Sequence, residues 1–295
     1  MRANGLFRAA LLLVAGGWAC GPAPDRERGA LPGNPPSGAP TTIAFDAGRR
    51  RLLKAYPHAL YQSRDAGWSW EAIPLPPSAS AGTIVAVVAP PKVPGTLFLG
   101  IRGAGVLRTD DDGATWRRLG HGLPSAGIEA LAAHSTLDST LYVFLAGDGV
   151  YQTEDGGVSW ARMDGGPGKA VGQLLHSSLE GSMKSGWVYA GTPQGVQRTM
   201  DCFCGWRSAG QLPAQVTSYS VVVDPTQPAH LFAAGAAGVF RSVDGGESWE
   251  LACGDAPEKI SLAYDPAKSV LYAATREGAI LVSRDGGAQW ESAGG

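Results

Sequence analysis

The octapeptide TEDGGVSW, residues 153–160, returns with small changes along the whole chain. Its other copies are SRDAGWSW (63–70), TDDDGATW (109–116), TMDCFCGW (199–206), SVDGGESW (242–249) and SRDGGAQW (283–290). Their first residues are separated by 46, 44, 46, 43 and 41 positions. A pattern that returns at a nearly constant interval of this size is typical of repeat architectures.

The shared pattern is Ser/Thr-x-Asp-x-Gly-x-Ser/Thr-Trp, here called the box. The aspartate can accept hydrogen bonds from backbone N–H groups of its own turn, and the glycine supplies a positive φ. The tryptophan buries a ring under the turn, which contributes about 2–3 kcal/mol. We assign structural roles to Asp65, Trp70, Asp111, Trp116, Asp155, Trp160, Asp201, Trp206, Asp244, Trp249, Asp285 and Trp290. The fourth copy departs from the pattern at Phe203 and Gly205, and the last at Gln289.

Apolar segments around each box complete a unit of four predicted strands. HLFAAGAAGVFRS (230–242) has the pattern of a strand, a short turn and a strand, and YSVVVDP (219–225) is a further strand before it. Four strands in a unit of 41 to 46 residues are typical of a propeller blade. The sequence predicts an all-β fold, a six-bladed β-propeller of four-stranded antiparallel blades over residues 41–295. We expect blade one to pack on blade six without sharing a sheet.

The boxes resemble the Asp-box, or bacterial neuraminidase repeat, of a propeller family, and the resemblance covers the whole chain after residue 40. That family includes sialidases, sortilin-type receptors and proteins similar to photosystem II stability/assembly factors, and the long repeat is most similar to the last group. The resemblance implies that ligands bind on the face opposite the boxes. The candidate ligand face then carries His58, Arg102, Asp148, Gln194, Arg276 and Glu277. Arg102 and Arg276 suit a carboxylate or an acidic side chain of another protein, although two solvated arginines are the alternative.

Residues that end the predicted inner strands form a second candidate set, because inner strands converge on the central tunnel. Asp46, His134, His176, Asp224 and Asp265 could ligate a divalent metal at one mouth of that tunnel. Ordinary turn chemistry is the alternative, and the Asp-Pro pairs favour it. We therefore predict no metal and no other cofactor.

The cysteines of the irregular fourth box predict a local disulfide. Cys202 and Cys204 are one residue apart in a chain that we expect to reach an oxidising compartment. A bridge between them could replace the missing box glycine as a constraint on the turn. Cys253 then stays outside the bridge.

The N-terminus has the features of a processing segment. In residues 1–20 two arginines precede a short apolar run and small residues, as in an export signal. The segment ends GWAC, which resembles a bacterial lipoprotein signal and implies lipidation of Cys20; cleavage after Ala19 is the alternative. Residues 21–40, with six prolines and four glycines, are predicted to be a linker. We expect an outer-membrane lipoprotein, or a periplasmic or extracellular protein.

Composition disfavours nucleic acid as a partner, because a net charge of −2 leaves no basic excess to neutralise phosphates. We expect a monomeric, non-enzymatic scaffold that binds an envelope protein or glycan and meets the membrane only through its lipid. The alternative is a glycoside hydrolase of the exo-sialidase type that uses the ligand face. The family resemblance implies three arginines around the substrate of such an enzyme, and only Arg102 and Arg276 can be placed there. No catalytic residue is therefore predicted.

Overall fold

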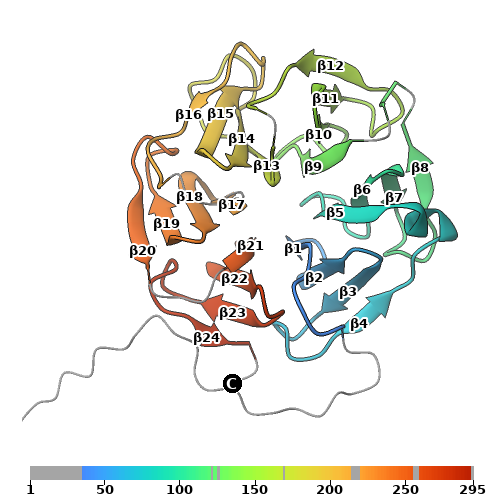
Figure 1. Ribbon diagram of the computed structural model, residues 1–295, viewed down its shortest axis with the longest axis horizontal. Helices are drawn as coiled ribbons and strands as arrows, with labels where there is room; N and C mark the ends of the chain where they lie inside the picture. Colours follow the sequence, from blue (N-terminus) through green and yellow to red (C-terminus); the bar gives the residue numbers. More distant parts are fainter. Residues whose placement is uncertain are drawn as a thin grey trace, which may run out of the picture.

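Six separate four-stranded antiparallel sheets stand around a central axis, which confirms the predicted six-bladed β-propeller (Figure 1). The computed structural model describes residues 35–293, apart from 121, 125–126, 169, 214–219 and 255–258. Within these residues the one helix is the short 3-10 helix η1 (Pro77–Ala81), between blades 1 and 2. The described residues contain no helix with the length and apolar character needed to cross a bilayer.

Each blade is made of four strands that are consecutive in the chain. Blade 1 has β1 (Thr42–Asp46), β2 (Arg51–Tyr56), β3 (Ala59–Ser63) and β4 (Glu71–Ile73), and blade 2 has β5 (Thr83–Val88), β6 (Leu97–Arg102), β7 (Gly105–Thr109) and β8 (Arg117–Leu119). Blade 3 has β9 (Ile128–Ala133), β10 (Leu141–Leu145), β11 (Gly149–Thr153) and β12 (Ala161–Asp164), and blade 4 has β13 (Gln173–Ser177), β14 (Trp187–Thr192), β15 (Gly195–Met200) and β16 (Arg207–Ser208). Blade 5 has β17 (Ser220–Asp224), β18 (Gln227–Gly235), β19 (Gly238–Ser242) and β20 (Glu250–Cys253), and blade 6 has β21 (Lys259–Asp265), β22 (Val270–Thr275), β23 (Ile280–Ser283) and β24 (Glu291–Ser292).

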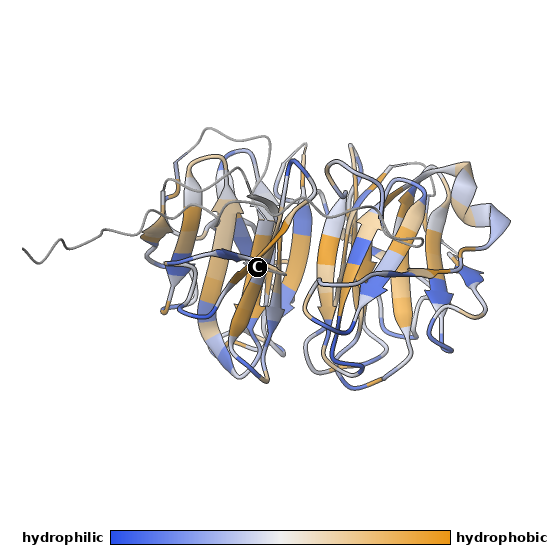
Figure 2. Ribbon diagram, turned by 90° about the horizontal axis from the view of Figure 1, so that it is seen from below, coloured by the Kyte–Doolittle hydropathy of each residue, from blue (hydrophilic) through white to orange (hydrophobic). Residues whose placement is uncertain are grey.

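The apolar runs of the sequence become the second strands of the blades. Every residue of β10 and of β22 is buried, because these strands lie inside a sheet that packs between two neighbouring sheets. The outermost strands are short, and the first two residues of β4, β8, β12 and β20 are exposed. Viewed from the side, apolar residues fill the strands and polar residues gather in the turns at both faces (Figure 2).

Five of the six boxes close the same hydrogen-bond network, except that Gln289 of the last box offers no hydroxyl to Asp285. In blade 3, Asp155 accepts hydrogen bonds from the Thr153 hydroxyl at 2.7 Å and from the Ser159 backbone N–H and hydroxyl at 3.0 and 2.6 Å. The Thr153 hydroxyl in turn accepts the N–H of Gly157 at 2.9 Å. Equivalent bonds are made around Asp65, Asp111, Asp244 and Asp285. These five aspartates have the predicted geometry of a turn lock.

The box also joins its blade to the blade before it. A Cβ on Gly113 would lie 2.3 Å from the Ile73 side chain of blade 1, and one on Gly157 would lie 2.4 Å from Leu119 of blade 2. The Trp116 indole N–H donates to the carbonyl of Pro74 of blade 1 at 2.9 Å, beside an intrabox bond to Gly113 at 3.1 Å. The box glycine is therefore required by close packing as well as by its positive φ.

The ring closes as predicted, by packing of β1 against β21 without a shared sheet. The backbone N–H of Ile43 donates to the Ser261 hydroxyl at 3.1 Å across this seam. Side chains at three other junctions accept a backbone N–H of the next blade in the same manner: Glu129 from Val171, Gln173 from Val221 and Ser220 from Leu262. Four of the six junctions between blades thus have the same kind of hydrogen bond, from a backbone N–H of one blade to a side chain of the adjacent blade.

Residues 35–40, which the sequence assigns to the linker, lie against the propeller at the seam. The Tyr56 hydroxyl donates to the Pro36 carbonyl at 2.8 Å. Gly38 approaches blade 6 so closely that a Cβ on Gly278 would lie 2.3 Å from its carbonyl oxygen. This strap crosses from blade 1 to blade 6 on the face opposite the boxes, where the turns after β2 and β22 lie.

Removal of a box indole should unfold the protein more readily. Trp160 is only 7% exposed, so we expect Trp160→Ala to lower the free energy of unfolding by about 3–5 kcal/mol. Trp68, in the first box but 51% exposed, provides the control, and Trp68→Ala should cost less than about 1 kcal/mol. Urea titration measures both. Equal losses in the two variants would contradict the role assigned to the box tryptophan.

Acid should weaken the boxes. Hydrogen bonds from the hydroxyl and backbone of Thr115 lower the pKa of Asp111 to about 2. Because the folded pKa lies below the value of about 3.9 in an unfolded chain, the stabilisation is complete above pH 4 and is lost as pH falls towards 2. We expect Asp111→Asn to remove part of this acid sensitivity in urea titrations at pH 7 and pH 3, whereas Asp138→Asn, at an exposed site, should leave it unchanged. An unchanged pH dependence in Asp111→Asn would show that the box carboxylate is not its source.

Candidate functional site

Two histidines from neighbouring blades meet where their inner strands end, on the face that carries the boxes. His134 follows β9 and His176 lies in β13, and both side chains are buried. Their rings stack with centroids 3.7 Å apart, and the ring of Tyr142 in β10 stacks on His176 at 5.8 Å. The structure thus brings together the two histidines that the sequence placed at one mouth of the tunnel.

The three aspartates of the same candidate set remain in their own turns. Each accepts the backbone N–H of a residue two or three positions later: Asp46 from Arg49 at 3.0 Å, Asp224 from Thr226 at 2.8 Å and Asp265 from Ala267 at 3.0 Å. Among the described residues, none of the three belongs to a group at metal-ligand distances. Asp46, Asp224 and Asp265 therefore do the turn chemistry that was the alternative to metal binding, and they do not join the two histidines.

His134 performs the same turn function with an imidazole. Its Nδ1 accepts the N–H groups of Thr136 and Leu137, both at 3.1 Å. Nδ1 of His176 accepts the N–H of Ser135 at 3.2 Å across the blade junction. A ring nitrogen that accepts a hydrogen bond carries no proton, so each neutral ring has its proton on Nε2.

Burial keeps both rings neutral at pH 7. Desolvation, together with a smaller contribution from the neighbouring His134, lowers the pKa of His176 to about 3. Desolvation also lowers the pKa of His134, with Lys92 adding to the effect and Asp201 opposing it. A neutral imidazole can donate one hydrogen bond or offer one lone pair to a ligand, but it cannot balance a negative charge.

Asp201 leaves the box geometry that the sequence predicted for it. One carboxylate oxygen, Oδ2, accepts the Ser185 N–H at 2.7 Å and also the Ser185 hydroxyl, in the loop between β13 and β14. The Thr199 hydroxyl, whose equivalents bond the box aspartate in the other blades, has no partner. The cause is the irregular sequence: the bulky Phe203 replaces the box glycine and packs on Tyr142 at 5.8 Å.

The displaced carboxylate joins the two histidines. One nitrogen of each ring and one oxygen of Asp201 lie within 4.8 Å of one another, and all three residues are buried. The hydroxyl of Ser185 lies 2.8 Å from His134 Nε2 and bridges it to Asp201. His176 Nε2, Asp201 Oδ1, the Tyr142 hydroxyl and the Thr199 hydroxyl are buried atoms without a hydrogen-bond partner. Two nitrogens and a carboxylate oxygen form a donor set that divalent transition metals accept.

Sequence reasoning missed Asp201, Ser185 and Tyr142 in this cluster. The available signal was the irregular fourth box, because a phenylalanine at the glycine position cannot keep the close contact that the box glycine makes with the preceding blade. Phe203 and Gly205 were identified as departures, but their effect on the Asp201 carboxylate depends on packing between blades, which no local pattern shows.

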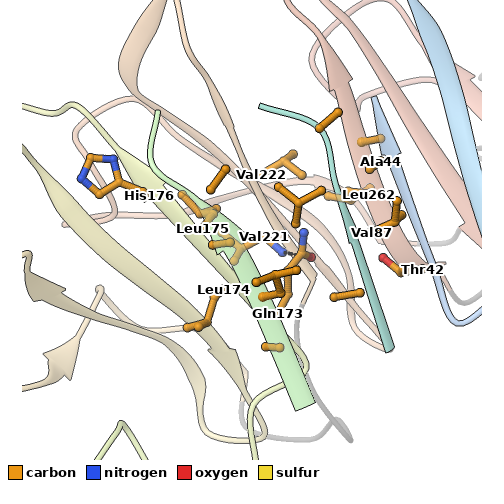
Figure 3. A pocket seen from close by; sticks show the side chains of 18 of the residues that line it. Thr42, Ala44, Val87, Gln173, Leu174, Leu175, His176, Val221, Val222 and Leu262 are labelled. Carbon is orange, nitrogen blue, oxygen red and sulfur yellow. Dashed lines mark hydrogen bonds between the residues drawn. The ribbon is translucent and has the colours of Figure 1, made fainter. Parts of the chain in front are cut away.

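An axial cavity of about 230 Å³ lies inside the ring of inner strands. Its lining is mainly aliphatic, with Val87, Leu174 and Leu262 among the labelled side chains of Figure 3. Gln173 provides a polar group there, and its side-chain oxygen accepts hydrogen bonds from Ser220 and Val221 of the next blade. His176 borders the same cavity at its box-face end, so the histidine cluster and the cavity adjoin.

The six candidate ligand-face residues lie in turns between second and third strands, or at the end of a second strand, on the face opposite the boxes. Five side chains are exposed: His58, Arg102, Gln194, Arg276 and Glu277. The sixth, Asp148, pairs with Arg162 at 3.0 Å and accepts the Tyr151 hydroxyl at 2.8 Å. These residues come from five blades, and the strap at Pro36 and Gly38 lies beside the blade 1 and blade 6 members.

Cys202 and Cys204 form a disulfide, as predicted, and Cys253 is buried outside it. The bridge encloses Phe203, the residue that enters the core beside Tyr142. The lipidation site predicted at Cys20 lies outside the described residues.

No protein-family model and no curated protein matches the sequence. Solved structures match it through their fold. The GH74 xyloglucanase from Xanthomonas campestris aligns with 86% of this chain at 22% identity and a TM-score of 0.60, and YCF48 bound to D1 peptide aligns with 89% at 19% identity and a TM-score of 0.55. YCF48 from Cyanidioschyzon merolae aligns with 89% at 14% identity and a TM-score of 0.56.

The chain is a β-propeller. It spans about half the length of the GH74 enzymes that it matches, with 46% and 47% of two of those chains covered. It spans 87% and 86% of the two YCF48 chains. At these identities the likeness establishes the architecture and leaves activity to be argued from this chain's own residues.

Substitution of His134 should reveal its turn function. We expect His134→Ala to lower the free energy of unfolding by about 1–2 kcal/mol, because the partly buried hydrogen bonds from the N–H groups of Thr136 and Leu137 lose their acceptor. His134→Asn should cost less, since its side-chain oxygen can accept from the same N–H groups. Urea titration in the presence of a chelator compares the two variants. An equal loss of unfolding free energy in the two variants would mean that the turn requires the packing of the His134 ring and not its Nδ1 acceptor.

Proposed function

We propose that the protein is an exported Asp-box propeller, lipidated at Cys20, that binds an extended segment of an envelope protein on its ligand face without catalysing a reaction. The observation that carries this proposal is the nearly full-length correspondence with YCF48, one structure of which is described as bound to D1 peptide. By contrast, more than half of each GH74 chain has no counterpart in this chain.

The ligand face has features that suit a peptide. Its turns are short, and GTPQG (191–195) and GAAG (235–238) present backbone groups with little side-chain cover. Arg102 is exposed on blade 2, so a segment with acidic side chains would find a planar guanidinium group there. These properties favour recognition of a peptide through hydrogen bonds to its backbone and through its charged side chains, which peptide-binding surfaces commonly use.

The strap supports a partner close to the membrane. Pro36 and Gly38 lie on the ligand face, so the chain leads towards Cys20 from that face. Sixteen residue steps separate Cys20 from Pro36, which reach about 53–58 Å at most when fully extended. A lipid at Cys20 would therefore keep Pro36, which lies on the ligand face, within that distance of the bilayer.

A glycoside hydrolase is the second candidate: the sequence suggests the exo-sialidase type, and the likeness to GH74 enzymes favours a glycoside hydrolase in general. Glycosidases other than sialidases require two carboxyl groups that flank the scissile bond. Asp148 and Glu277 are the acidic residues of the candidate ligand face, on blades 3 and 6. Asp148 already binds Arg162 and Tyr151, an arrangement that fits a structural carboxylate better than a proton donor.

Site-specific photo-cross-linking in native envelopes tests the proposal. A photoreactive residue at position 102, on the ligand face, should give a discrete protein adduct in membranes that carry the full chain. The same residue at position 158, exposed in a box on the opposite face, is the matched control and should give none. Arg276→Ala should reduce the adduct at position 102 if acidic side chains are recognised.

Adducts of equal yield at positions 102 and 158 would contradict a ligand face. Hydrolysis of a fluorogenic sialoside or of xyloglucan by the purified protein, lost on Asp148→Ala, would favour the hydrolase instead. Retention of the Cys20→Ala variant in the membrane fraction would remove the lipid anchor from the proposal while leaving the binding face intact.

A further inference from the structure

Asp201 is a buried carboxylate whose negative charge has no balancing cation. Asp201 is only 2% exposed, and no lysine or arginine of the described part of the chain forms an ion pair with its carboxylate. Buried charges in proteins are normally paired or bound to a metal, because an isolated one is costly to desolvate. The adjacent groups, two neutral imidazoles and a phenol, offer dipoles and lone pairs but no positive charge.

We propose that His134, His176 and Asp201 bind a divalent first-row transition metal ion of the zinc type, through Nε2 of both rings and a carboxylate oxygen. Nitrogen and oxygen atoms within 4.8 Å of one another provide three ligands, which leaves one position of a tetrahedron open. The ion would supply the missing positive charge and occupy the space faced by His176 Nε2 and Asp201 Oδ1, two buried atoms without partners. This site is independent of the binding function proposed for the opposite face.

Binding at Nε2 requires each ring to move its proton to Nδ1, so that the ring stays neutral. Each Nδ1–H would then have a hydroxyl oxygen as hydrogen-bond acceptor. Ser135 Oγ lies 2.9 Å from Nδ1 of His176, and Thr136 Oγ1 lies 3.3 Å from Nδ1 of His134. Metal-bound histidines commonly donate from their second nitrogen in this way. The backbone N–H groups that now bond Nδ1 lose their acceptor, and each lost bond should weaken the affinity roughly 5-fold. We therefore expect micromolar rather than nanomolar binding.

Access to the site runs past Ser185. This exposed residue, at the end of the loop between β13 and β14, places its hydroxyl between His134 Nε2 and Asp201. Metal–nitrogen distances of about 2.0–2.1 Å bring tetrahedral ligand atoms to about 3.3 Å from one another, so the three ligands must close slightly around the ion. Rotation of the Ser185 side chain removes the hydroxyl from the space that the ion would enter.

Calorimetric titration of the tag-free, chelator-treated full chain with Zn²⁺ and Co²⁺ tests the site. We expect one ion per chain, a visible Co²⁺ spectrum typical of low-symmetry nitrogen and oxygen ligation, and a higher melting temperature in the presence of Zn²⁺. Asp201→Asn and His176→Gln should each weaken binding by about 100-fold or more, since even loss of a residue behind a ligand costs about 10–100-fold. Asp224→Asn, which changes an equally buried carboxylate of blade 5 outside the cluster, should bind as the wild type does.

Circular dichroism of each variant separates loss of a ligand from loss of the fold. Failure of the wild-type protein to bind Zn²⁺ or Co²⁺ stoichiometrically would overturn the proposal, and a water molecule would then be the bridge between His176 Nε2 and Asp201 Oδ1. Wild-type affinity in both the Asp201→Asn and His176→Gln variants, if they are folded, would overturn it as well, because the ion would then lie elsewhere.

Discussion

The ring depends on a contact between a turn and the blade that precedes it. The box glycine of one blade lies directly on the outer strand of its neighbour, as Gly157 does on Leu119, and no larger residue fits there. The same turn buries an indole and locks its aspartate with hydroxyl and backbone donors. One octapeptide thus supplies both the local turn and a contact between blades, and its repetition places equivalent contacts around the ring.

This coupling explains why the fold was predictable from sequence. Blade number, strand order and closure at the seam follow from six tryptophans in register, since each box implies a hairpin and a neighbour. The candidate site was predictable only in part. His134 and His176 were placed at one tunnel mouth because inner strands converge, whereas Asp201 reached them only through displacement of its turn by Phe203. That displacement depends on how the sheets of two blades pack against each other, which the sequence of a single repeat does not show.

The irregular blade is also the chemically distinctive one. Blades 1, 2, 3, 5 and 6 have boxes whose carboxylates accept hydrogen bonds from their own turns. Blade 4 loses that regularity and gains a disulfide, a buried carboxylate and several unpartnered polar atoms. Places where a sequence breaks its own local rule are frequently functional sites, and here the break concentrates polar groups between blades 3 and 4.

The strap at Pro36 and Gly38 has a mechanical consequence. Five junctions of the ring are continuous in the polypeptide, whereas blades 1 and 6 are joined only by non-covalent contacts, and the strap lies over this junction. Tension on the N-terminal segment would thus first load the Tyr56–Pro36 hydrogen bond and the contact with Gly278, before it reached β1. The strap would therefore detach before the seam itself opens, and its release would leave the packing of β1 against β21 in place.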